Sequence, residues 1–313
     1  MWHHFLNLFV VSFIFLSTKS LAHKNCTYDY HPNQPEVYYI NLKRSIDRDK
    51  SMQQLLSSMK LRHFRVEAVS SSSLYVPSDL IPQQSGSSFP NVYKYKSIET
   101  IETSSKVMGD TNKHHLIHGL CTRGILWTEL YCSMSHLLAI YRAVHSPTAT
   151  SEYALIMEDD IHIPISTDYN ELAASAPSDF GILQLLTVNA RKVIDLWGLY
   201  DKQHTLWSKR NNNLYWSTGI YLINREKLRP IIDSIIHIDP IYPTIIQYTL
   251  IASKPRRRKD IPYECTSYFK TTMMLACVRV GNLAADRYIY AMSTTYMSSL
   301  SIAYVQTGFK TTV

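Results

Sequence analysis

Apolar and polar residues along the chain follow periods that predict an α/β protein. Residues 36–42 are rich in β-forming side chains and predict a first strand. Apolar positions at helical spacing up to Met59 predict a helix after Ser45, its expected cap, and residues 63–69 predict a second strand. A strand–helix–strand unit of this kind joins parallel neighbours, so the sheet is expected to be mostly parallel.

The rest of the chain predicts further elements of both kinds. Helices are expected at 129–144, 226–236 and 242–252, and strands at 153–157, 180–186 and 216–224. By contrast, residues 70–118 are polar, with a serine run, and predict a long loop at the edge of a site. The organisation of residues 287–313 is unclear. Because no repeat or linker interrupts residues 36–313, they are expected to form one domain.

The predicted strand at 153–157 continues directly into three consecutive carboxylates, Glu158, Asp159 and Asp160. These acids should lie at the carboxyl end of a buried strand, which is the edge where open α/β sheets bind ligands. Packed carboxylates resist ionising together unless a cation joins them. The stretch therefore predicts a divalent metal and, with it, a phosphorylated substrate.

Composition and charge narrow the picture only slightly. The chain has 313 residues, 45% of them hydrophobic, and a formal net charge of +7, which is mild for this length. Its compact basic run at 256–259 is either a solvated loop, a phosphate clamp or a surface for an anionic acceptor. Nothing else resembles a nucleic-acid module, so no nucleic-acid partner is expected.

The amino-terminal residues predict entry into the secretory pathway. An apolar segment from Phe5 to Leu16, followed by small residues, fits a signal peptide over residues 1–22, with a short uncleaved anchor as the alternative. Only an uncleaved anchor would attach the protein to a membrane. Residues 23–35 are expected to be flexible and to carry a glycan on Asn25, within an Asn-Cys-Thr sequon. The catalytic domain is thus expected in the endoplasmic reticulum or Golgi lumen, or secreted.

Five cysteines leave at least one unpaired in a monomer. In an oxidising compartment, local bridges between Cys121 and Cys132, or between Cys265 and Cys277, are possible.

Five segments resemble the motifs of glycosyltransferase family 25, which includes lipooligosaccharide and procollagen galactosyltransferases. Residues 40–48 resemble its opening Ile-Asn-Leu-x-Arg-x-x-Asp-Arg, and residues 65–69 its second strand. Residues 129–136 are similar to its Glu-x-x-Cys-x-x-Ser-His helix. Residues 155–160 match its acidic strand end, and residues 219–223 its later Gly-x-Tyr-Leu-Ile strand. The resemblance implies a GT-A-like single α/β domain, with a mixed, mostly parallel sheet flanked by helices, that binds a nucleotide-sugar at its strand ends.

The resemblance also implies roles for individual residues. Asp160, with Asp159, is the expected ligand of Mn²⁺ or Mg²⁺, the cation that would neutralise the leaving diphosphate. An inverting transfer needs a general base, for which Glu158 and Asp286 are the candidates. The residues expected to contact the UDP-sugar donor are Asn41, Arg44, Arg48, Glu129, His136 and Asp159.

Structural roles are the alternative for four of these residues. Asp159 could be a helix cap or an acid in a loop. Arg48 could instead pair with Asp47 or Asp49 at the surface, and Asn41 could merely satisfy backbone groups. His136 could be a core histidine bonded to a backbone group.

The leading hypothesis is a metal-dependent glycosyltransferase of the secretory pathway. It would transfer a sugar, galactose by resemblance, from a UDP-sugar to a hydroxyl on a protein or glycan. The alternative is an inactive relative that binds a glycan or a partner, which departures from the family pattern at Ser70, Thr128 and Tyr131 favour. A secreted metal-dependent hydrolase is a third hypothesis, but the chain lacks the clustered histidines common in such sites.

Overall fold

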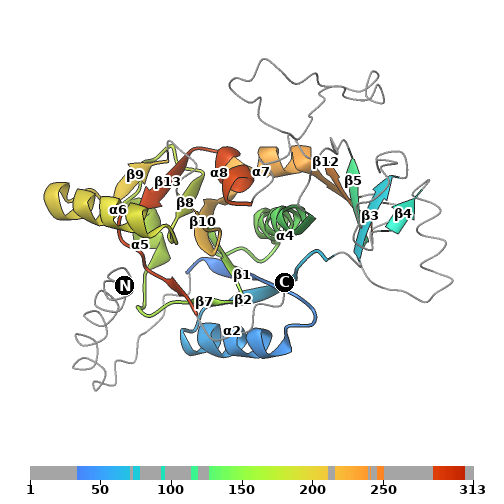
Figure 1. Ribbon diagram of the computed structural model, residues 1–313, viewed down its shortest axis with the longest axis horizontal. Helices are drawn as coiled ribbons and strands as arrows, with labels where there is room; N and C mark the ends of the chain where they lie inside the picture. Colours follow the sequence, from blue (N-terminus) through green and yellow to red (C-terminus); the bar gives the residue numbers. More distant parts are fainter. Residues whose placement is uncertain are drawn as a thin grey trace, which may run out of the picture. The chain divides into compact units, whose positions relative to one another are not determined.

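The strand that leads into Glu158, Asp159 and Asp160 lies inside a seven-stranded sheet, and Figure 1 labels most strands of this sheet. The computed structural model describes residues 34–70, 73–77, 93–95, 114–118, 127–210, 216–238, 240, 245–249 and 285–306. Within them the sheet order is β2 (His63–Glu67), β1 (Glu36–Asn41), β6 (Tyr153–Glu158), β10 (Ile220–Asn224), β8 (Ile182–Gln184), β13 (Thr295–Ser298) and β9 (Trp207–Lys209).

Most strands of this sheet point the same way. β1 pairs in parallel with both β2 and β6, as the first strand–helix–strand unit predicts. β10 runs antiparallel to β6 and to β8, while β13 is parallel to β8 and antiparallel to β9. The expected α/β class with a mixed, mostly parallel sheet is therefore confirmed.

Two helices cover opposite faces of β1. Side chains alternate along a strand, and Tyr38 and Ile40 pack into the core cluster that contains residues of α4 (Trp127–Val144). Tyr39 points the other way, and its hydroxyl donates to Asp49 of α2 (Ile46–Ser58) at 2.6 Å. Helices α7 (Arg225–Ile235) and α8 (Ala285–Ala291) pack against α4. The other helices among the described residues are α5 (Tyr169–Ala174) and α6 (Ala190–Gln203).

A second, five-stranded sheet corrects two predictions from the sequence. Its order is β11 (Ile236–Ile238), β12 (Ile245–Thr249), β5 (His114–His118), β3 (Leu74–Pro77) and β4 (Tyr93–Tyr95). Residues 70–118, expected to be a loop, thus contribute three short strands. The helix predicted at 242–252 is wrong, because residues 245–249 form a strand that pairs with β5 and β11. Ile246 and Tyr248 are buried, so the segment follows a period of two.

The strand predicted at 216–224 begins later, at Ile220. Ser217 has a φ of 117°, which interrupts extended backbone before the strand starts. The unassigned carboxyl-terminal residues form α8 and β13. They also form β14 (Tyr304–Val305), which pairs with β7 (Ile161–His162) just beyond the acidic residues.

The amino-terminal predictions fall outside the described residues, including the signal segment at 1–22 and Asn25. Of the segment 23–35, only residues 34 and 35 are described. Gln34 is buried, and its side-chain oxygen accepts a hydrogen bond from the Tyr169 amide at 3.1 Å. No helix in the part of the chain that the structure describes is both long and apolar enough to cross a membrane.

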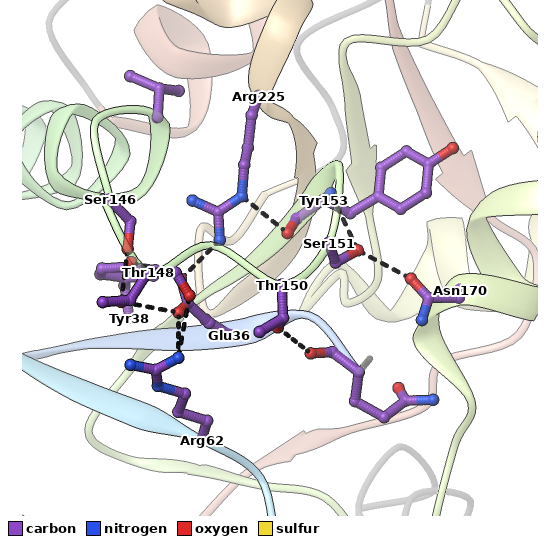
Figure 2. A network of polar contacts seen from close by, with 12 residues as sticks. Glu36, Tyr38, Arg62, Ser146, Thr148, Thr150, Ser151, Tyr153, Asn170 and Arg225 are labelled. Carbon is purple, nitrogen blue, oxygen red and sulfur yellow. Dashed lines mark hydrogen bonds and ion pairs between the residues drawn. The ribbon is translucent and has the colours of Figure 1, made fainter. Parts of the chain in front are cut away.

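A buried polar network ties the amino end of β1 to its neighbours (Figure 2). Glu36 is 0% exposed, and its carboxylate accepts from Arg225 at 2.9 Å and from the Tyr38 hydroxyl at 2.9 Å. Arg62 lies 3.3 Å from the second carboxylate oxygen. Arg225 also donates to the Tyr153 carbonyl at 3.0 Å. A buried acid thus joins β1, β6 and the first turn of α7.

Glu36→Gln should destabilise the fold by about 3–5 kcal/mol, because it leaves the Arg225 cation buried without its carboxylate. Urea denaturation of the purified protein measures the change. Asp195→Asn is the matched control, since Asp195 is 49% exposed and pairs with Lys192 at the surface of α6. The control should cost less than about 1 kcal/mol. Equal effects of the two substitutions would contradict a stabilising role for the buried pair.

Candidate functional site

The end of β6 sends its acids to opposite faces of the sheet. Glu158 is the register partner of Ile40, which packs in the core cluster on the α4 side. Successive side chains of a strand alternate, and Asp159 accordingly contacts Arg48 of α2. Three acids in sequence therefore occupy different environments.

Asp159 is held by two side chains from the β1–α2 segment. The Asn41 amide donates to one carboxylate oxygen at 2.7 Å, and Arg48 donates to the other at 3.0 Å. Arg48 also lies 3.8 Å from Asp160. Arg48 thus forms ion pairs with two acids that lie more than a hundred residues away in sequence.

Arg65 of β2 fixes Asn41 from the other side. Its Nε donates to the Asn41 side-chain oxygen at 2.9 Å and lies 3.5 Å from Asp49. Both ends of the Asn41 amide are therefore hydrogen-bonded, because its nitrogen also donates to the Ser45 carbonyl at 3.1 Å. Arg65 was missed as a site residue, although it stands in the segment 65–69 that resembles the family's second strand.

Glu158 faces α4 and binds His136. The His136 Nε2 lies 3.2 Å from a Glu158 oxygen, and its Nδ1 lies 3.0 Å from the Tyr221 hydroxyl. Thr218 donates its hydroxyl to the same Glu158 oxygen at 2.7 Å. His136 is buried as expected of a core histidine, but its partners are side chains rather than backbone groups.

The pKa of Glu158 reflects opposing effects. Burial raises the pKa, but the hydrogen bond and charge of His136, the Thr218 hydroxyl and the Arg48 charge together bring it below the ordinary value. Glu158 is consequently a stable carboxylate at neutral pH.

The loop before β10 positions Thr218. Ser217 has a positive φ of 117°, a conformation that non-glycine residues rarely adopt and that needs support from its surroundings. The Ser217 carbonyl accepts from the Tyr290 hydroxyl of α8 at 2.9 Å and from Gln184 at 3.2 Å. At Gly219 a Cβ would lie 2.6 Å from the end of the Ile161 side chain, which would have to shift to admit it. Thr218 and Tyr290 were both missed by sequence reasoning.

The ionisation of Asp160 is strongly perturbed. Burial, followed by the charges of Glu158 and Asp159, raises its pKa to about 6, and Arg48 opposes the change. The Asp160 side chain is 24% exposed. A cation stabilises a carboxylate that two neighbouring carboxylates repel, and oxygen donors suit the hard ions Mn²⁺ and Mg²⁺. The residues present therefore fit the expected metal.

A cavity of about 590 Å³ opens over these groups. It is bordered by all three acids and by the β1–α2 turn, where Lys43 and Arg44 are exposed. The structure thus brings together these predicted site residues: Arg44, Arg48, His136, Glu158, Asp159 and Asp160. Asn41 is buried beneath them.

Glu129 and Asp286 complete the predicted set of site residues. Glu129 lies in the first turn of α4, and its side chain is outside the described part. Asp286 lies on α8, one turn before Tyr290, and burial raises its pKa while Arg210 and Arg287 lower it. Both predicted roles remain untested predictions.

Carboxylates and arginines around a cavity at the carboxyl ends of parallel strands define an α/β protein suited to an anionic ligand and a cation. The family model described as "Glycosyltransferase family 25 (LPS biosynthesis protein)" matches residues 34–241, which is more than half of the chain. The chain belongs to glycosyltransferase family 25. This membership confirms the resemblance that the sequence motifs indicate.

Other comparisons add little. No curated protein shows significant similarity to the chain. Among solved structures, a mutant of Drosophila beta-1,4-galactosyltransferase 7 in complex with manganese, UDP-Gal and xylobiose is 10% identical, with a TM-score of 0.25. The match covers 63% of this chain and 52% of that chain, so this chain spans about half the length of the solved one. A likeness of this degree does not define shared ligands.

Without a divalent cation, Asp160→Asn should stabilise the protein above about pH 7, by up to about 3 kcal/mol. The folded pKa of Asp160, about 6, lies above its usual 3.8, so stability from its protonated form is lost as pH rises through about 6. The gain should shrink as the pH falls below about 6, where the wild-type side chain becomes protonated. Urea denaturation with a chelator, at a series of pH values, measures both effects.

The control has the opposite sign. A hydrogen bond from Tyr296 lowers the pKa of Asp179, so Asp179→Asn should reduce stability at neutral pH. Loss of stability in metal-free Asp160→Asn above about pH 7 would contradict the electrostatic crowding of the three acids.

Proposed function

We propose that this protein is a metal-dependent glycosyltransferase that transfers a sugar, with galactose the first choice, from a UDP-sugar to a hydroxyl of a protein or glycan. The observation that carries the proposal is the single cavity that combines three consecutive carboxylates with Arg44 and Arg48. Family membership supplies the reaction class.

The residues of the cavity fit the two ends of a nucleotide-sugar. Asp160, backed by Asp159, would hold Mn²⁺ or Mg²⁺, and the bound cation would neutralise charge on the diphosphate leaving group. Arg44 is exposed at the cavity edge, where its forked donors suit phosphate oxygens. Arg48 already contacts both aspartates, so we assign it to positioning them.

Glu158 is the stronger candidate for the general base. It borders the cavity, whereas Asp286 is not among the lining residues. The hydrogen bond from Thr218 and the contact with His136 hold its carboxylate in one orientation, in which it could accept a proton from the acceptor. An acceptor hydroxyl bound beside Glu158 would transfer its proton to this carboxylate as its oxygen bonds to the anomeric carbon and the sugar–phosphate bond breaks, which releases the diphosphate.

The apolar segment from Phe5 to Leu16 and the sequon at Asn25 support a location in the lumen of the secretory pathway. In that compartment, the acceptors available are hydroxyl groups of proteins and glycans.

The purified protein should release UDP from a UDP-sugar when Mn²⁺ and an acceptor are present, and a chelator should abolish the release. Asp160→Ala should lower turnover at least about 100-fold, because metal stabilisation of the leaving group is worth several kcal/mol. The matched control, Asp195→Ala on the surface of α6, should retain wild-type turnover.

The outcomes separate the two leading hypotheses. Metal-dependent binding of UDP without turnover on any sugar would identify the protein as an inactive glycan- or partner-binding relative. Neither binding nor turnover would overturn the proposal, and full activity of Asp160→Ala would overturn the metal assignment.

A further inference from the structure

A second group of potential metal ligands lies in the same cavity, on the α4 side. Cys132 and His136 are four residues apart on α4 and so share one face of the helix. Glu158 approaches them from the end of β6. One ligand atom from each of the three residues lies within 4.8 Å of the others, and all three line the cavity.

Neighbouring side chains hydrogen-bond to two of these ligands and orient them, as such neighbours do around bound metals. The Tyr221 hydroxyl lies 3.0 Å from His136 Nδ1, which leaves Nε2 directed at Glu158. Thr218 donates to Glu158 at 2.7 Å and fixes its carboxylate. Histidine ligands of metals usually bond through their second nitrogen in this manner, and carboxylate ligands are themselves hydrogen-bonded.

The donor atoms differ in chemistry from those around Asp160. Sulfur, imidazole nitrogen and one carboxylate oxygen suit Zn²⁺, whereas Mn²⁺ and Mg²⁺ prefer oxygen alone. Tetrahedral zinc with such ligands holds its donor atoms about 3.3–3.6 Å apart. The distance of 3.2 Å between His136 Nε2 and the Glu158 oxygen is close to this spacing, and the ligand atoms of all three residues lie within 4.8 Å of one another.

We propose that Cys132, His136 and Glu158 form a zinc site, separate from the cation position at Asp160, and that zinc bound there inhibits the enzyme. Zinc at this position replaces the contact between His136 and Glu158 and removes the Glu158 carboxylate from proton transfer. Its fourth coordination position opens into the cavity. The metal site stands on its own geometry, while the inhibition rests on the proposed transferase function.

Cobalt(II) is the probe, because it replaces zinc and its bond to a thiolate gives a charge-transfer absorbance. The purified protein is titrated with Co²⁺ in excess Mg²⁺, which occupies oxygen-only positions. We expect one equivalent of Co²⁺ to produce the thiolate band and Zn²⁺ to remove it. Cys132→Ser should abolish the band, and Asp160→Asn should retain it.

Tyr221→Phe provides a second variant, since it removes only the hydroxyl that orients His136. It should weaken Co²⁺ binding about 10-fold or more while the band persists. Circular dichroism checks that each variant is folded. No band in the wild type, or a band unchanged in Cys132→Ser, would overturn the site, as would a Cys132 thiol blocked by a disulfide.

The inhibition is tested separately with the UDP-release assay at saturating Mn²⁺. Zinc should inhibit the wild type, and Cys132→Ser should require at least about 10-fold more zinc for the same inhibition. Equal sensitivity would refute the inhibitory role. If no turnover occurs at all, the proposed function fails, while the cobalt spectrum still decides the metal site.

Discussion

The alternation of side chains at the end of β6 is the constraint on which the site depends. It directs Glu158 to the α4 face and Asp159 to the α2 face, and a register shift of one residue would exchange them. Pairing with β1 on one side and β10 on the other fixes the register, through partners such as Ile40 with Glu158 and Ile220 with Met157. Backbone geometry thereby directs Glu158 away from Asp159 before any ligand binds.

This separation gives the two sides of the cavity different chemistry. On the α2 side, Asn41 and Arg48 hold Asp159. Burial, followed by the negative charges of Glu158 and Asp159, raises the pKa of the adjacent Asp160, so a bound cation would stabilise its carboxylate. On the α4 side, Glu158 interacts with the Thr218 hydroxyl and the His136 imidazole. The Glu36 network anchors the amino end of β1, so this strand is fixed at both ends by polar contacts. A strand fixed in this way can position catalytic groups more precisely than a loop would.

The sequence predicted the elements near the acids better than those far from them. The strand that ends at Glu158 and the helix that contains His136 each show the periodicity of their element within their own residues. β1, α2, α4 and β6 were therefore predicted correctly. β12 was mistaken for a helix because its strand character depends on β5, which pairs with it from more than a hundred residues away. The partners of Arg48 and the support of Ser217 by Tyr290 are likewise long-range contacts, which spacing along one chain does not reveal.

The central claim is that the α2 side of the cavity binds a hard cation and the diphosphate of a nucleotide-sugar. A crystal structure of the protein with Mn²⁺ and UDP, with anomalous scattering recorded at the manganese edge, tests it most directly. The account predicts one manganese peak within bonding distance of the Asp160 carboxylate, with the diphosphate between it and Arg44. Manganese bound only between Cys132 and His136, or UDP bound away from Asp160, would contradict the account.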